Sequence, residues 1–269
     1  MGQVNLLTKI YGPTPKRVLD HIRKDLLVLS SGLRLKIKIL GKSDRGFVQI
    51  ILEGEDQEVA ISYIREHYGV APFEIDQGSI GKETTGKIVE SGHVGYGLYL
   101  DLGLSNRSID ALIPLRVLRE QLVNGENLSI RQLIRLFALQ DNIPISILIT
   151  EVSPDKGEIS ARLADRQART YRRWIKSNLE RVIAAGILRE DIKKALAKTD
   201  HSRDIIRIDS IGLLEHVIVC KEETQAPGLI ASLGPFLVGV PLYSFIPTKI
   251  RADVEHNSMK DDSKAKTDE

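Results

Sequence analysis

The chain has 269 residues, which suggests more than one folded unit, because domains commonly hold about 100 to 200 residues. Hydrophobic residues make up 42% and charged residues 28%, and these ordinary globular values exclude a wholly disordered chain. The formal net charge is only +2, yet residues 16–45 hold nine basic against three acidic side chains, and residues 166–200 hold ten against four. This concentration favours an anionic partner, although two solvated helices would give the same pattern.

The sequence also indicates where the protein works. Its single cysteine, Cys220, cannot form an internal disulfide or a multi-thiolate zinc site, which fits a reducing compartment. The first residues lack the pattern of a targeting peptide. No apolar run approaches the roughly 18 residues that a membrane span requires. We therefore expect a cytoplasmic protein without a membrane partner.

The first predicted unit, residues 1–77, alternates strands and helices. The expected elements are a strand at 4–10, a helix from 13 to 30, strands at 34–39 and 47–52, and a helix at 55–68. Strict alternation in the second strand is typical of one buried and one open face. This order predicts a small antiparallel sheet with both helices on one side.

The open face of this sheet is a candidate RNA surface. Arg34, Lys36 and Lys38 would point outward together, beside an exposed Phe47. Basic groups with an aromatic ring resemble the surfaces on which RNA-binding sheets hold phosphates and stacked bases. A solvated face or a docking surface for another domain would show the same pattern.

The second unit, residues 78–164, has glycine-punctuated strands and a helix before the fourth of five strands, which points to an OB-type barrel. Ser129 is the expected cap of that helix, and Arg131 and Arg135 lie on its outer face. Four segments resemble the S1-type RNA-binding domain. They are residues 86–89 (GKIV), 96–103 (YGLYLDLG), 111–114 (ALIP) and 157–160 (GEIS).

The S1 resemblance implies that Tyr96 and Tyr99 stack on bases. Strict alternation would place the two rings on opposite faces, so a bulge near Gly95 or Gly97 is needed if both are to reach RNA. Packing of one tyrosine inside the barrel is the alternative. Three other positions of the family surface are altered. They are Pro114, Ser153 and Glu158.

The third unit, residues 165–250, is expected to begin with a helix from 165 to 184. Arg169 and Arg173 lie mostly away from its apolar stripe and could follow a phosphate backbone. A helix at 189–198, strands at 205–209 and 214–221, a helix at 225–234 and a strand at 240–245 follow. The repeated order of helix, strand, strand, helix suggests a degenerate internal repeat. Residues 251–269 lack an apolar pattern and are expected to be a disordered tail.

A second resemblance extends over nearly the whole chain. Its most distinctive part is residues 204–234, and it includes the first strand and helix, residues 68–70 and residues 161–165. These segments resemble the archaeal family catalogued as domain of unknown function 2110. The resemblance implies an archaeal source, and RNA binding through the central barrel.

Catalytic patterns are not found. None of the six histidines is spaced as a metal pair, and Cys220 on an apolar strand is expected to be core. The glycines of residues 91–97 neither open a helix nor precede a P-loop lysine. Asp101, Asp155 and Glu158 show no sign of separated acid and base roles. We expect no enzyme activity, no cofactor and no metal.

The sequence thus predicts an α+β protein in which a five-stranded S1-like OB barrel lies between two small α/β units with antiparallel sheets. The leading hypothesis is a non-catalytic RNA-binding protein of archaeal translation or RNA processing. The alternative is a protein-interaction scaffold that docks on the ribosome or RNA polymerase without binding RNA, which the three altered positions favour.

Overall fold

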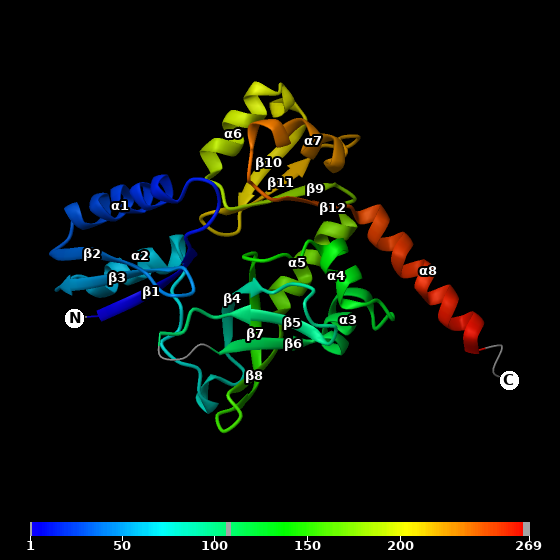
Figure 1. Cartoon of the computed structure of the whole chain (residues 1–269), viewed down its shortest axis with the longest axis horizontal. Helices are drawn as coiled ribbons and strands as arrows, with labels where there is room; N and C mark the ends of the chain where they lie inside the picture. The colour runs from blue at the N-terminus through cyan, green and yellow to red at the C-terminus, as the bar shows by residue number, and fades with distance from the viewer. Residues whose placement is uncertain (1, 106–108, 266–269) are drawn as a thin grey trace.

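The computed structural model describes residues 2–105 and 109–265. It has a closed five-stranded barrel with an α/β unit on either side, so the predicted α+β architecture is confirmed (Figure 1). In the described ranges, no helix is long and apolar enough to cross a membrane.

The first unit is an antiparallel sheet covered on one face by two helices. Its elements are β1 (Gly2–Lys9), α1 (Pro15–Ser31), β2 (Leu35–Lys42), β3 (Phe47–Gly54) and α2 (Gln57–His67), and the sheet order is β1-β3-β2. Val48, Ile50 and Leu52 of β3 are buried in the same apolar cluster as the inner residues of α1 and α2. The predicted alternation of this sheet is therefore confirmed.

The barrel closes in the order β4-β5-β6-β8-β7, with β6 and β8 parallel. Its elements are β4 (Glu83–Val89), β5 (Gly97–Asp101), β6 (Asp110–Pro114), α3 (Leu115–Val123), α4 (Ile130–Phe137), β7 (Pro144–Ser153) and β8 (Glu158–Leu163), after a short 3-10 helix, Gln77–Ser79. Two helices thus precede the fourth strand where one was expected. Ser129 caps α4 as predicted, since its hydroxyl accepts the Gln132 N–H at 3.3 Å.

The last unit begins differently from the prediction. Helix α5 (Asp165–Lys176) ends well before residue 184, and residues 181–185 form strand β9 (Arg181–Ala185). Asn178 has a φ of 55°, in the left-handed region, which breaks the helix. The strand is buried on both faces, so it lacks the alternation that would distinguish it from a helix.

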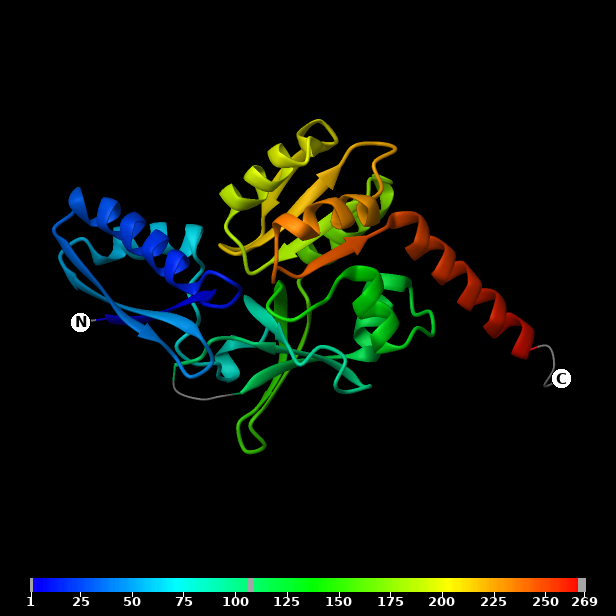
Figure 2. The ribbon, with the colours of Figure 1, turned by 45° about the horizontal axis from the view of Figure 1, so that its top comes forward.

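A four-stranded antiparallel sheet with the order β10-β11-β9-β12 forms the body of this unit. Its further elements are α6 (Arg189–Lys198), β10 (Ile205–Ser210), β11 (Glu215–Cys220), α7 (Ala226–Leu233) and β12 (Leu242–Phe245), with 3-10 turns at His201–Arg203 and Gly234–Phe236. Val182 and Ile218 belong to the apolar cluster with α6 and α7, whereas Ile183 and Val217 belong to the cluster of the barrel. Figure 2 shows this unit, in yellow to orange, above the barrel, with α6 at its top.

The two flanking units share one topology, as the predicted repeat requires. The order β1-β3-β2 corresponds to β9-β11-β10, and β12 lies on the free side of β9. In the first unit, Val70 forms an antiparallel bridge with Leu6 of β1 at the equivalent place. The last unit has the β-α-β-β-α-β arrangement called ferredoxin-like, and the first unit has the same order with a single bridge in place of its fourth strand.

The C-terminal segment differs from the expected disordered tail. Helix α8 (Pro247–Ala265) follows β12 directly and extends away from the body of the molecule (Figure 1). Ile250 is buried and Val254 packs against the barrel cluster. Together with the Arg251 guanidinium group, which donates to the Ile175 carbonyl at 3.0 Å, these two apolar side chains fix the start of a helix that lacks an amphipathic pattern. Residues 266–269 of the expected tail lie outside the described ranges.

Candidate nucleic-acid interface

Tyr96 and Tyr99 lie together on the outer surface of the barrel. Their hydroxyl oxygens are 2.9 Å apart, and their rings meet edge to face with centroids 6.2 Å apart. Tyr96 precedes β5 and is 58% exposed, so strand alternation does not control its direction. The alternative in which one ring packs inside the barrel is therefore wrong. The hydrogen bond with Tyr96 raises the pKa of Tyr99 to about 12.

Two carboxylates lie on the strands that follow β5 around the barrel. Asp110 begins β6, which pairs with β5, and Glu158 begins β8, which pairs with β6. Their negative charges also raise the pKa of Tyr99. Arg45 is held in an ion pair with Asp110 at 2.7 Å. Negative charge at this surface opposes a phosphate backbone.

The predicted basic face of the first sheet is present in part. Lys36 and Lys38 are exposed on the face away from the helices, while Arg34 lies before β2 and pairs with Glu55 at 2.8 Å. Phe47 is only 1% exposed, so the prediction of an exposed ring is wrong. Its ring lies beneath the Lys9 ammonium group, 4.7 Å from the centroid. At this end, the face is a docking surface for the barrel.

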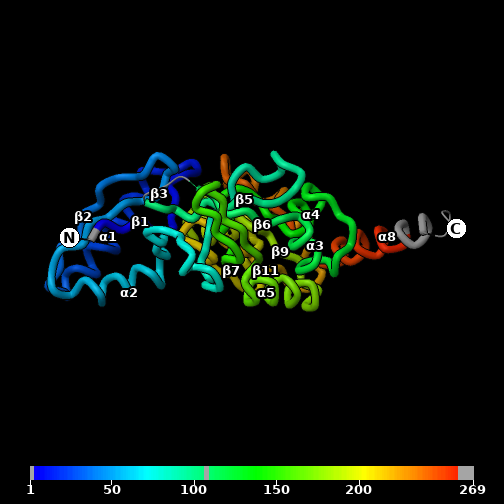
Figure 3. Tube along the Cα trace, turned by 90° about the horizontal axis from the view of Figure 1, so that it is seen from below, coloured from blue at the N-terminus to red at the C-terminus, as the bar shows by residue number. Residues whose placement is uncertain are grey.

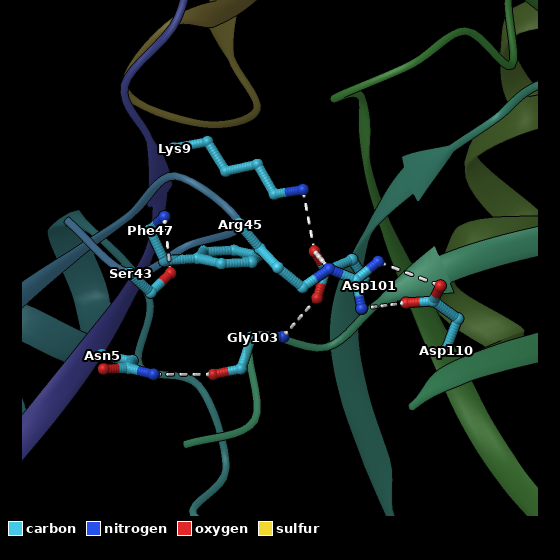
Figure 4. A network of polar contacts seen from close by, with 8 residues as sticks. All are labelled: Asn5, Lys9, Ser43, Arg45, Phe47, Asp101, Gly103 and Asp110. Atoms are coloured by element: carbon cyan, nitrogen blue, oxygen red, sulfur yellow. Dashed lines mark hydrogen bonds and ion pairs between the residues drawn. The ribbon is translucent and has the colours of Figure 1, made fainter. Parts of the chain in front are cut away.

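Figure 4 shows the contacts that join the first unit to the barrel. The buried carboxylate of Asp101 pairs with Lys9 at 2.8 Å and with Arg45 at 2.9 Å. The Asn5 side-chain amide donates to the carbonyl of Gly103 at 3.0 Å. Opposite charges and a buried hydrogen bond therefore fix the orientation of the first sheet on the barrel.

Arg131 and Arg135 lie on the exposed side of α4, as predicted. The Arg135 guanidinium group faces Asp253 of α8 at 3.5 Å. The carboxylate of Asp253 thus neutralises part of the positive charge that Arg131 and Arg135 place on α4.

A concentrated positive surface lies along α5. Ala168 and Tyr171 are buried, so the arginines of this helix face solvent. The helix forms one side of a shallow groove of about 650 Å³, which we call the basic groove. It is lined by Ser146, Arg166, Gln167, Arg169, Thr170, Arg172, Arg173 and Lys176.

The polar contacts within the basic groove leave it strongly positive. Arg166 pairs with Glu83 at 3.2 Å, and Arg173 donates to the hydroxyl of Thr170 at 3.1 Å. The nearby carboxylate of Asp165 accepts a hydrogen bond from Arg162, which lowers the pKa of that carboxyl group. The groove residues themselves are five cations and three neutral polar side chains.

The predicted site residues therefore do not form one surface. Arg169 and Arg173 meet in the basic groove, while the tyrosine pair, the lysines of β2 and the arginines of α4 lie elsewhere. Figure 3 shows β5 and α5 on opposite sides of the barrel. Sequence reasoning missed Arg172, although its position next to Arg173 on an arginine-rich helix was a usable signal.

The single cysteine has the surroundings of a core residue. Cys220 is buried, and burial raises the pKa of its thiol to about 11, as befits the predicted core residue. In the described ranges, no group of three metal-ligating side chains is found.

Comparison with protein families gives three matches along the chain. Residues 3–73 match the DUF2110 N-terminal domain, residues 79–175 the DUF2110 central domain and residues 179–242 the DUF2110 C-terminal domain. A search of the curated proteins gives no match.

Several solved structures are similar to parts of this chain. A protein from Methanocaldococcus jannaschii, MJ1198, has 17% identity, 34% coverage of this chain, 96% of its own length and a TM-score of 0.23. A chain of the a/eIF2alpha–aDim2p–rRNA complex from Pyrococcus horikoshii has 16% identity and a TM-score of 0.26, and the match covers 47% of this chain and 65% of that chain. The intact alpha subunit of aIF2 from Pyrococcus abyssi has 11% identity and a TM-score of 0.26, and the match covers 65% of this chain and 98% of that chain. Likenesses this distant carry no argument about function, and the S1 type of the barrel stays a prediction.

Proposed function

We propose that this chain, which belongs to the DUF2110 family, is a non-catalytic RNA-binding protein that holds a single strand in the basic groove. The observation that carries this proposal is the gathering of five cations from one helix along one groove. Archaeal translation or RNA processing is the setting that the sequence resemblances imply.

The groove has the chemistry that a phosphate backbone requires. Guanidinium groups bind phosphate oxygens with paired hydrogen bonds, and each phosphate contact releases a bound counterion. Arg169 and Arg173 project from successive turns of α5, with Arg172 next to Arg173, so neighbouring phosphates of one strand can be contacted in turn. Binding of this kind depends on charge and tolerates many sequences.

The tyrosine pair supports a different candidate. The Tyr96 ring is exposed, but the negative charge of Glu158 opposes phosphate there, while Asp110 is paired with Arg45. Exposed tyrosines beside carboxylates suit a protein partner with basic side chains. The scaffold hypothesis, in which the protein docks on the ribosome or RNA polymerase, would use this face. In the RNA-binding proposal, the role of the other exposed cations is at most to extend the contact with RNA. They are Lys36, Lys38, Arg131 and Arg135.

Fluorescence anisotropy with short labelled RNAs across a salt series tests the proposal. For single strands, the logarithm of the binding constant falls with the logarithm of salt by about 0.7 per phosphate contact. The double variant Arg169→Gln with Arg173→Gln should therefore reduce this slope by about 1.4 and weaken binding. A matched control, Arg23→Gln with Arg116→Gln, changes two exposed arginines outside the groove.

The control variant should bind like the wild type. Equal salt slopes for the groove variant and the wild type would exclude the basic groove as the RNA site. Absence of RNA binding by the wild type at low salt would favour the scaffold.

A further inference from the structure

The basic groove leads into a deeper cavity where the three units meet. This junction cavity has a volume of about 630 Å³ and shares Ser146, Arg166, Gln167 and Thr170 with the groove. Arg65 and Tyr68 come from the first unit, Thr85 and Lys87 from the barrel, and Ser210 and Gly212 from the last sheet. A single RNA strand bound in the basic groove would therefore lie directly beside the junction cavity.

The lining of the junction cavity combines three kinds of group. Positive charge comes from Arg65 and from Arg166, which is shared with the exposed carboxylate of Glu83 at 3.2 Å, and Glu66 is the carboxylate of its wall. Lys87 is also positive, but its ammonium group is paired with Glu215. Gln167 and Ser146 supply an amide and a hydroxyl group of the kind that bonds to the edge of a base, while the Thr170 hydroxyl donates to the Arg166 carbonyl at 2.9 Å.

An aromatic ring completes the set. Trp174 lines the cavity and is half-buried, and the rings of Tyr171 and Phe245 meet it nearly at right angles, with centroid distances of 5.5 and 5.2 Å. The Arg181 guanidinium group lies over the Trp174 ring, 5.1 Å from its centroid, so a base would bind against the part of the ring that lines the cavity. Phe137 and Tyr171 are almost fully buried and form part of the floor. A ring that is fixed by packing in this way loses little entropy when a base binds against it.

We infer that the junction cavity holds one nucleotide of the bound strand, with its base against Trp174 and its phosphate near Arg65 and Arg166. This inference rests on the proposed function and adds to it a pocket for a single flipped-out base. The volume lies within the range of about 300 to 1,000 Å³ that is usual for small-ligand sites. A duplex does not fit in such a cavity, so the inference also predicts a preference for single strands.

The fluorescence of Trp174 tests this inference directly, because it is the only tryptophan of the chain and it does not line the basic groove. The full-length protein is titrated with adenosine monophosphate, uridine monophosphate and inorganic phosphate. We expect the nucleotides to change the emission in a saturable way and inorganic phosphate to leave it unchanged. A short single-stranded RNA should displace the nucleotide.

Two variants show whether the signal comes from the cavity. Arg65→Glu, on the exposed rim, should weaken nucleotide binding about tenfold, the effect of losing one charge-assisted hydrogen bond. Lys24→Glu, on the exposed side of α1, is the matched control and should have no effect. Equal nucleotide affinities for both variants would overturn the inference.

The outcomes separate the inference from the proposed function. If RNA binds with the groove-dependent salt slope but neither nucleotides nor RNA change the Trp174 emission, the inference fails and the proposed function stands. If RNA does not bind at all, both fail as stated, even where a free nucleotide still enters the cavity.

Discussion

The ammonium group of Lys87, on β4 of the barrel, lies 2.6 Å from a carboxylate oxygen of Glu215, on β11 of the last sheet, and both side chains are almost fully buried. The Tyr11 hydroxyl donates to the other oxygen of Glu215 at 2.5 Å. One carboxylate thus joins all three units, and Lys87 also lines the junction cavity. These contacts fix the relative positions of the walls of that cavity.

Lys87→Met should destabilise the protein strongly, because it leaves the Glu215 carboxylate buried without its cation. Breaking a buried pair in this way costs about 3–5 kcal/mol. The free energy of unfolding from urea denaturation is the measurement. The control, Arg34→Met, breaks the exposed pair with Glu55 and should cost at most about 1 kcal/mol. A similar cost for the two variants would show that Lys87 and Glu215 are not paired.

His216 should make stability depend on pH. Burial lowers the pKa of its imidazole below the ordinary value, because the charged ring would lose its hydration, and this effect outweighs the hydrogen bond to the Ile187 carbonyl at 3.0 Å, which acts in the opposite direction. The unfolded chain then binds the proton more readily, so this contribution is complete above about pH 6.5 and is lost as the pH falls. His216→Gln should reduce the loss of thermal stability between pH 7.5 and 5.5. An unchanged pH dependence would contradict this assignment.

Phe47→Ala tests the corrected position of this ring. A fully buried phenylalanine costs about 3–5 kcal/mol to truncate, whereas a surface ring costs within about 0.5 kcal/mol. We expect the larger loss in a denaturation experiment, because the ring packs at the junction with the barrel. A decrease in the free energy of unfolding of less than about 1 kcal/mol would show instead that the ring is exposed and faces RNA.

The double variant Tyr96→Ala with Tyr99→Ala should keep its fold, since the two hydroxyls bond to each other and Tyr96 is exposed. Stacking on a base is worth about 1–3 kcal/mol per ring, so a true stacking pair would lose RNA affinity at least tenfold. We expect less than about a threefold change, because the carboxylates nearby repel phosphate. Anisotropy, with circular dichroism as the folding control, decides between these results.

The predicted elements were most accurate where one face is buried and the other is open. Alternation in 34–39 correctly placed Lys36 and Lys38 on the face away from the helices. Strand β9 was missed because it is buried on both sides, and nothing in its periodicity separates it from a helix. Helix α8 was missed because its apolar contacts come from Ile250 and Val254, and its polar contacts, such as Arg251 to the Ile175 carbonyl, depend on distant parts of the chain.

The candidate site was harder to predict, because its geometry depends on contacts between distant parts of the chain. Tyr11 and Glu215 are separated by 204 positions in the sequence, and no local sequence pattern predicts their contact. The same is true of the carboxylates near Tyr99, whose effect depends on how β6 and β8 lie beside β5. The exposed face of a single helix could be predicted from the sequence, and Arg169 and Arg173 were identified from the exposed face of α5.

Photocrosslinking of a thiouridine-substituted single-stranded RNA, followed by digestion with a glutamate-specific protease and mass spectrometry, tests the proposed site most directly. Cleavage after Glu158 and Glu180 isolates α5 in the fragment 159–180, while cleavage after Glu90 and Glu120 isolates the tyrosine pair in the fragment 91–120. We predict that the crosslinked nucleotide is found on the fragment 159–180. Crosslinking confined to the fragment 91–120 would contradict the basic groove as the RNA site and move it to the barrel face.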